Sequence, residues 1–147
     1  MLTKIADNQI VINLLPNDLS EQTYISDEHL YIKPEFIYKV CQELQNNPET
    51  QYNYLKSISA IDYIEYFEIV YHLDSLINNT SLVLKTKLFG RSKLSVKSVT
   101  SLWKGAELQE REIWDLMGIY FEDHPNMKRI LLWEGFEGHP LRKDFIK

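Results

Sequence analysis

The stretch EREIWDLMGIYFEDHPNMKRIL, residues 110–131, marks where the regular part of this chain ends and an irregular segment begins. The sequence EGHPLRKDF follows at residues 137–145, so the C-terminus combines two His-Pro pairs with several large aromatic side chains. Such an irregular segment cannot build its own core, and exposed aromatic side chains are typical of a surface that another molecule covers. We therefore predict a folded domain over residues 1–121 and an extended docking tail over residues 122–147, together forming a single domain unit.

A helix is predicted immediately before the tail. Apolar residues such as Leu102, Ile113 and Met117 recur on one face of residues 98–118, and Gly118 is well placed to end the helix.

Charged residues follow one another at intervals of four along this helix. Glu107, Arg111 and Asp115 are spaced so that the arginine can lie between two carboxylates. Such a ladder is more often a structural network than an active site. We expect it to anchor the helix to the start of the tail.

Upstream of this helix, alternating apolar residues predict strands at residues 23–26, 29–33, 52–60, 65–73 and 81–89. The last two strands would pair through a hairpin loop at 75–80, and their apolar faces align only if Glu68 lies across from Lys85 or Lys87. We predict helices over residues 2–8 and from Pro34 to Pro48, the second of which would bury Cys41 as an inert core thiol.

Composition excludes several classes of function. The chain has 147 residues, 44% of them hydrophobic, and a net charge of -5, which argues against nucleic acid as the main partner. Its single cysteine excludes an internal disulfide and any zinc or iron–sulfur site built from its thiolates alone. The apolar stretch Ile10 to Leu15 is too short for a signal peptide or a membrane span, and the chain ending at Lys147 predicts no fusion to a neighbour.

Six basic residues and no acidic residue lie between Lys85 and Lys104. They could form a surface for nucleic acid or for an acidic partner. The alternative is that Lys85 and Lys87 pair with Glu68 while the others are solvated. We favour the second interpretation, because no ladder of aromatic residues accompanies the charges.

Two histidines in the tail raise the possibility of a metal site. His124 and His139 are each followed by proline and lie near acidic residues. They are fifteen residues apart in irregular chain, however, and lack the short spacing of a zinc motif. The five glycines match neither a dinucleotide-binding fingerprint nor a phosphate-binding loop.

Residues 110–131 closely resemble the signature of the thirty-kilodalton subunit family of respiratory complex I, the NADH:quinone oxidoreductase. That signature has a Glu-Arg-Glu, an acidic residue with two apolar residues, and a histidine followed by a basic-apolar pair. The matching residues here include Glu110, Arg111, Glu112, Asp115, His124, Lys128 and Arg129. EGHPLRKDF resembles the family's second hallmark, and weaker similarity extends the match to about residues 30–147. Leu108 and the segment from Trp133 to Phe136 depart from the family pattern.

The resemblance implies a two-layer α+β domain, with a mixed β-sheet packed by helices, and an extended irregular C-terminal tail laid over partner subunits. It implies a non-catalytic structural and assembly subunit of the hydrophilic arm, near the quinone-site subunit. NADH, FMN, the iron–sulfur clusters and quinone would all be bound by partner subunits. The complex would catalyse NADH oxidation coupled to ion translocation, with this chain on the cytoplasmic side of the inner membrane and no span of its own.

The tail supplies the expected docking residues. Its basic side chains suit carboxylates on partners, its aromatic side chains suit buried anchors, and fully extended it could reach roughly 85 Å. We expect it to be mobile in the free protein. The predicted docking side chains are Trp133, Phe136, His139, Pro140, Arg142, Lys143 and Phe145, with Lys128 and Arg129 as further basic groups.

Two alternatives remain. The chain could be the equivalent subunit of a related membrane-bound hydrogenase or of a ferredoxin-linked complex, since no motif here identifies the electron donor. It could also be a freestanding metal-binding enzyme that uses His124 and His139.

Overall fold

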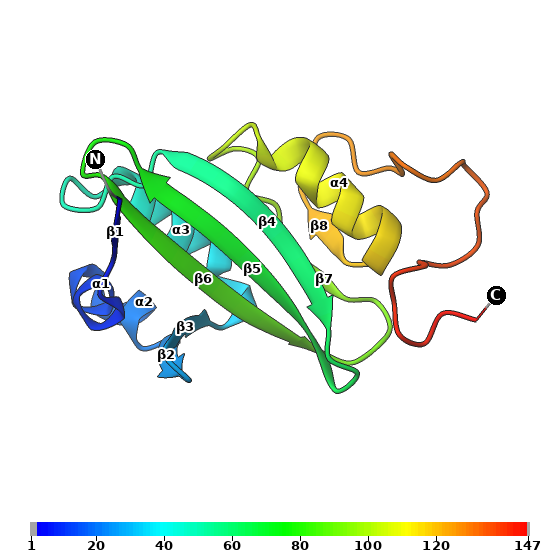
Figure 1. The fold of residues 1–147 in the computed structure, drawn as a ribbon, viewed down its shortest axis with the longest axis horizontal. Helices are drawn as coiled ribbons and strands as arrows, with labels where there is room; N and C mark the ends of the chain where they lie inside the picture. The colour runs from blue at the N-terminus through cyan, green and yellow to red at the C-terminus, as the bar shows by residue number, and fades with distance from the viewer. Residues whose placement is uncertain (1–2, 147) are drawn as a thin grey trace.

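The computed structural model describes residues 3–146 and shows a mixed β-sheet packed by helices (Figure 1). The strands are β1 (Lys4–Ile5), β2 (Thr23–Ser26), β3 (His29–Ile32), β4 (Tyr54–Asp62), β5 (Tyr66–Ser75), β6 (Thr80–Phe89), β7 (Ser95–Lys97) and β8 (Tyr120–Glu122). The helices are α1 (Asn8–Leu14), α2 (Asn17–Ser20), α3 (Ile37–Asn46) and α4 (Ala106–Met117), with a 3-10 turn, η1 (Pro34–Phe36). The predicted α+β fold with a mixed sheet is confirmed.

The large sheet has the strand order β2-β3-β6-β5-β4, and β1 also pairs with β6. Strands β4, β5 and β6 form an antiparallel meander, whereas β1 and β3 run parallel to β6. The predicted register is confirmed, because Glu68 lies directly across from Lys87 and 3.5 Å from the ammonium of Lys85. The Tyr31 hydroxyl also donates to this buried carboxylate, at 2.8 Å.

Helix α3 covers one face of the sheet and lies behind it in Figure 1. Its apolar stripe, which includes Ile37, Val40 and Leu44, is fully buried. Cys41 lies in the same core, as predicted, and burial raises the pKa of its thiol well above the usual range. A buried, protonated thiol is a poor nucleophile.

The last helix is shorter than predicted, since α4 begins at Ala106 instead of residue 98. Residues 98–100 do not join it because the Ser98 hydroxyl and the Val99 amide both donate to the carboxylate of Glu110. These bonds compete with helical ones. The predicted end is confirmed: Gly118 has a left-handed conformation, with φ of 76°.

The prediction for residues 2–8 is wrong where the structure describes them, and Leu2 lies outside the described residues. Lys4 and Ile5 form β1, and the first helix begins at Asn8. Asp7 fixes that start, because its carboxylate accepts the amides of Gln9 and Ile10. No helix between residues 3 and 146 is long and apolar enough to cross a bilayer.

Helix α4 lies along β4, an edge strand of the large sheet (Figure 1). The Gln109 side chain accepts the outward-facing amide of Ile58 on β4, at 2.6 Å. The chain then leaves α4, forms β8, which pairs with β7, and continues as an irregular tail that loops back toward the far end of β4. The segment predicted as a tail therefore lies against α4.

Candidate docking site

Helix α4 carries two carboxylates that are completely shielded from solvent, Glu110 and Asp115. Charged groups are rarely buried unless hydrogen bonds or opposite charges compensate them. The two carboxylates bind different segments: Glu110 holds the loop that precedes the helix, and Asp115 holds the tail that follows it.

Asp115 fixes the path of the tail. One carboxylate oxygen accepts the backbone amides of Ile130, Leu131 and Leu132, at 3.1, 2.7 and 2.9 Å. The other accepts the guanidinium of Arg129, at 2.8 Å. Burial opposes ionisation of Asp115, but the hydrogen bonds outweigh this effect and lower its pKa. The group is therefore a carboxylate at neutral pH.

Arg129 continues the same network inside the tail. Besides Asp115, its guanidinium donates to the carbonyls of Phe136 and Gly138, at 2.9 and 2.7 Å, and it lies over the ring of Phe136. Arg129 therefore closes the tail into a loop. The expectation that it is free for a partner's carboxylate is corrected, because its own chain occupies it.

The prediction that Arg111 lies between two carboxylates is wrong. Its guanidinium donates to the backbone carbonyls of Lys128 and Arg129, at 3.1 and 3.0 Å. Asp115 instead accepts the backbone amides of residues 130–132, which follow these two carbonyls in the tail. The anchoring role expected for Arg111 does appear in the structure, but it uses backbone acceptors instead of an ion pair.

The two tail histidines bind α4 at different places. His124 contacts the carbonyl of Glu107, at 2.9 Å, and His139 contacts the carbonyl of Asp115, at 3.0 Å. These carbonyls are eight residues apart on the helix, about 12 Å at 1.5 Å per residue. The two rings therefore do not converge on a shared metal site. Burial lowers the pKa of His139, which keeps its ring neutral at physiological pH.

The end of the tail is fastened by a second network around Asp62, at the end of β4. Arg91 binds this buried carboxylate through two nitrogens, at 2.6 and 2.8 Å, and also binds Asp144 of the tail. The amide of Lys143 donates to the same carboxylate, at 2.8 Å. Arg142 donates to the carbonyls of Arg91 and of Met117, so it too is occupied within the chain.

These contacts leave apolar side chains of the tail exposed. Leu131 is 62% exposed and Trp133 is 69% exposed. The ring of Trp133 packs edge-on against Phe136, which in turn stacks with Phe145, at centroid distances of 6.0 and 6.2 Å. A row of aromatic rings held on an ordered backbone is typical of an interface hot spot.

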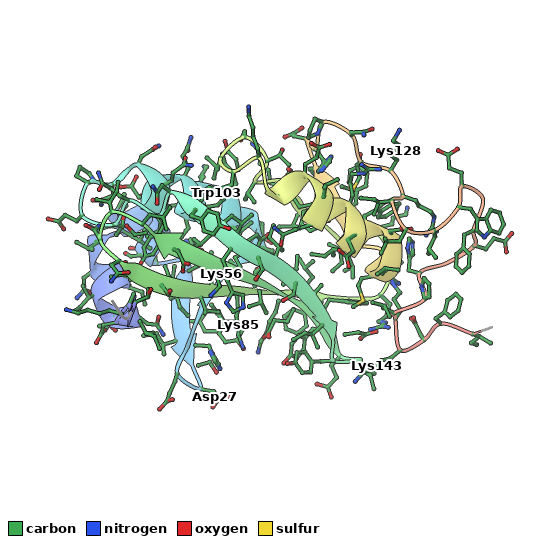
Figure 2. All side chains as sticks on the ribbon, turned by 45° about the horizontal axis from the view of Figure 1, so that its top comes forward. Asp27, Lys56, Lys85, Trp103, Lys128 and Lys143 are labelled. Atoms are coloured by element: carbon green, nitrogen blue, oxygen red, sulfur yellow. The ribbon has the colours of Figure 1, made fainter. Side chains whose placement is uncertain are left out.

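Two lysines flank this apolar face and are exposed. Lys128 and Lys143 lie at opposite ends of the tail's loop (Figure 2). Neither ammonium takes part in an ion pair among the contacts of residues 3–146. They therefore keep the role predicted for them, as groups available to a partner. Pro140, also predicted to dock, is partly buried.

Sequence reasoning brought most of these residues together but missed Asp62 and Arg91. Arg91 is one of the six basic residues from Lys85 to Lys104, half of which have an acidic partner in their own chain: Lys85 with Glu68, Arg91 with Asp62, and Lys97 with Asp123. The available signal was that Asp62 ends one strand of the meander and Arg91 follows another, so that both lie at the same end of the sheet. This signal does not predict the contact between Arg91 and Asp144, which are 53 positions apart in the sequence.

Glu110 differs from Asp115 because only Ser98 and Val99 compensate its burial, at 2.6 and 2.9 Å. Desolvation dominates and raises its pKa from 4.5 to about 7. Between about pH 4.5 and pH 7, Glu110 is therefore protonated in the folded protein and ionised in the unfolded chain. Glu110 thus contributes stability that is fully present below about pH 4.5 and is lost as pH rises through about 7.

We expect Glu110→Gln to remove this pH dependence, because an amide does not ionise. Its oxygen can accept the Val99 amide, and its NH2 group can donate to the Ser98 hydroxyl, so the bond to Ser98 is kept with its direction reversed. The free energy of unfolding of the wild type, relative to the variant, should fall by on the order of 3 kcal/mol between pH 5 and pH 8. Urea titrations across this range measure the difference, in which the contributions of Asp62, Asp115 and His139 cancel. A difference independent of pH would show that Glu110 is ionised throughout.

The contacts of this site fix the backbone of the tail and leave some of its side chains exposed. Its buried charged groups bind backbone and one another, and its exposed groups include the apolar side chains of Leu131 and Trp133, two lysines and the carboxylates of Glu134 and Glu137. Residues of both C-terminal motifs take part in two networks, which tie the tail to α4 and to the end of β4.

Comparison with known proteins identifies the family of this chain. The family model described as "Respiratory-chain NADH dehydrogenase, 30 Kd subunit" matches residues 30–147. The chain is 41% identical to the C subunit of the NADH-quinone oxidoreductase of Roseiflexus sp. (strain RS-1), over 86% of this chain and 74% of that protein. It is 40% identical to the NADH-ubiquinone oxidoreductase subunit 9 of Reclinomonas americana, over 92% of this chain and 67% of that protein.

The fold is similar to that of a chain in the membrane-bound sulfane sulfur reductase, described as an archaeal respiratory membrane complex. The TM-score is 0.73 at 23% identity, covering 94% of this chain and 82% of the other. At this identity the similarity concerns the fold alone.

Proposed function

This chain belongs to the thirty-kilodalton subunit family of respiratory-chain NADH dehydrogenase, a family of subunits of a membrane-associated respiratory complex, and from that membership we propose that it is a non-catalytic assembly subunit. It would stand in the hydrophilic arm of an NADH:quinone oxidoreductase, beside the subunit that forms the quinone site. NADH, FMN, iron–sulfur clusters and quinone would be held by its partners, on the cytoplasmic side of the membrane.

The hydrogen bonds of the signature residues support an assembly role. Arg111, Asp115, Arg129 and His139 all bind backbone of the chain itself, and their contacts fix the tail. The exposed face that results carries the apolar side chains of Leu131 and Trp133 together with the charged side chains of Lys128, Glu134 and Glu137. The tail would therefore dock as a preformed loop. The extended strap of roughly 85 Å does not fit this geometry, because the tail folds back on its own domain.

An affinity-tagged chain tests the proposal. We expect it to co-purify with the flavin- and cluster-containing subunits of an NADH:quinone oxidoreductase, and to show no NADH:quinone turnover when purified alone. Recovery with hydrogenase or ferredoxin-oxidising subunits would establish the alternative complex instead. Turnover by the purified chain above a buffer control would contradict the non-catalytic role.

A further inference from the structure

A second candidate interaction surface lies away from the tail loop. A groove of about 910 Å³ runs between the end of β6, the turn η1 and the loop that leads to β7. Four segments each contribute a lysine to its lining: Lys33, Lys87, Lys93 and Lys97. Only two carboxylates, Glu35 and Glu122, line the same groove. A local excess of positive charge is notable in a chain whose net charge is -5.

The positive charges are spread along the groove. The ammonium of Lys87 lies over the rings of Tyr31 and Tyr66, at 4.8 and 4.7 Å. The ammonium of Lys97 lies over Tyr38, a residue of α3, at 4.5 Å. Lys87 and Lys97 are thus each held against tyrosine rings of different elements. A single phosphate would need convergent donors, whereas a chain with several carboxylates would not.

Apolar groups complete the lining. The floor consists of core side chains such as Leu88, Leu94 and Val96, which are nearly inaccessible. The rim carries Phe89, 71% exposed, and Tyr24, 43% exposed. The volume is at the upper end of the range for small-molecule sites, about 300–1,000 Å³, and the groove is open. A short extended peptide fits these dimensions.

We propose that this groove binds an acidic segment of another protein subunit, whose carboxylates pair with Lys33, Lys87 and Lys93 and whose apolar side chains contact Phe89 and Tyr24. Lys97 already pairs with Asp123 of its own chain, at 3.8 Å. The proposal rests on the proposed function in one respect, since a subunit of the same complex supplies the segment. Exposed charge pairs of this kind mainly set orientation and association rate, while the apolar rim adds affinity. The groove would thus be a second contact, independent of the tail.

Zero-length cross-linking of the purified complex tests the groove. A carbodiimide joins an amine only to a carboxylate that touches it. We expect it to link Lys33 or Lys93 to aspartate or glutamate of another subunit. Acylation of the four groove lysines should be severalfold slower in the complex than in the free chain. Lys56, exposed on β4, provides the comparison within the same sample (Figure 2).

Equal acylation of the groove lysines in the complex and in the free chain would overturn the inference. A second result would also overturn it: groove lysines that are protected from acylation, form no cross-link to protein, and lose their protection when lipid is removed. That result would assign the groove to anionic lipid. A chain that co-purifies with its complex while these lysines stay reactive refutes only the groove. A chain that does not co-purify at all refutes the proposed function.

Discussion

Asp115→Asn is expected to lower the free energy of unfolding by about 3 kcal/mol at pH 7, the largest effect on stability among single substitutions in the tail network. The substitution preserves shape and removes charge. It leaves the guanidinium of Arg129, only 15% exposed, beside an amide instead of a carboxylate. Breaking a buried pair by removing one charge is costly because the other charge stays buried.

The same variant should loosen the tail before the domain unfolds. The amides of Ile130, Leu131 and Leu132 share one carboxylate oxygen of Asp115, and an amide oxygen is a weaker acceptor for three donors. Hydrogen exchange at these three amides should accelerate at pH 7. Urea titration gives the global stability, and exchange followed by mass spectrometry gives the local one.

Asp123→Asn is the matched control. Asp123 is 77% exposed and its oxygen lies 3.8 Å from Lys97, so the same chemical change should cost well under about 1 kcal/mol. Equal destabilisation by the two variants would mean that Asp115 is no more important than a surface charge. Unchanged exchange at residues 130–132 would mean that it does not hold the tail.

The sequence was sufficient for the pairing of β5 with β6, because hydrophobic periodicity and cross-strand charge agree there. It did not reveal β1, which was predicted as part of a helix. Aligning the two apolar faces predicts Glu68 across from Lys85 or Lys87, and in the structure Glu68 faces Lys87 and forms its ion pair with Lys85. The same reasoning failed for Arg111, because spacing of four on a helix identifies neighbours on that helix only. It cannot reveal the carbonyls of Lys128 and Arg129, which the tail brings to the arginine.

The tail was the least predictable part for a related reason. Its hydrogen bonds join residues of irregular chain to distant backbone, as when the Lys143 amide binds Asp62 on β4. No periodicity records such contacts. Composition did identify Trp133, which is 69% exposed in the structure, whereas Phe136 and Phe145 are half-buried.

We expect the double variant Leu131→Ala/Trp133→Ala to fold normally and to lose its place in the complex. Both side chains are largely exposed, at 62% and 69%, so stability should change by less than about 0.5 kcal/mol. A buried tryptophan at an interface is worth about 2–4 kcal/mol, or roughly 30- to 700-fold in affinity. The backbone of Leu131 keeps its bond to Asp115 in the variant.

This variant is a better test than removing residues 126–147, the obvious truncation. Deletion of the tail would take away Arg129 and every amide that Asp115 binds, leaving a buried carboxylate without partners. Failure of the truncated chain to assemble could then reflect unfolding. Leu76→Ala/Ile77→Ala provides the matched control, because these side chains are equally exposed, at 67% and 64%, in the loop between β5 and β6.

The central claim is that α4 holds the tail so that its apolar face can dock. The most direct measurement is the stoichiometry of each tagged double variant in the purified complex, with thermal unfolding of each free chain measured in parallel. We predict that Leu131→Ala/Trp133→Ala is largely absent from the complex while Leu76→Ala/Ile77→Ala is present at the wild-type ratio, and that both chains unfold at the wild-type temperature. Incorporation of the tail variant at the wild-type ratio would contradict the claim.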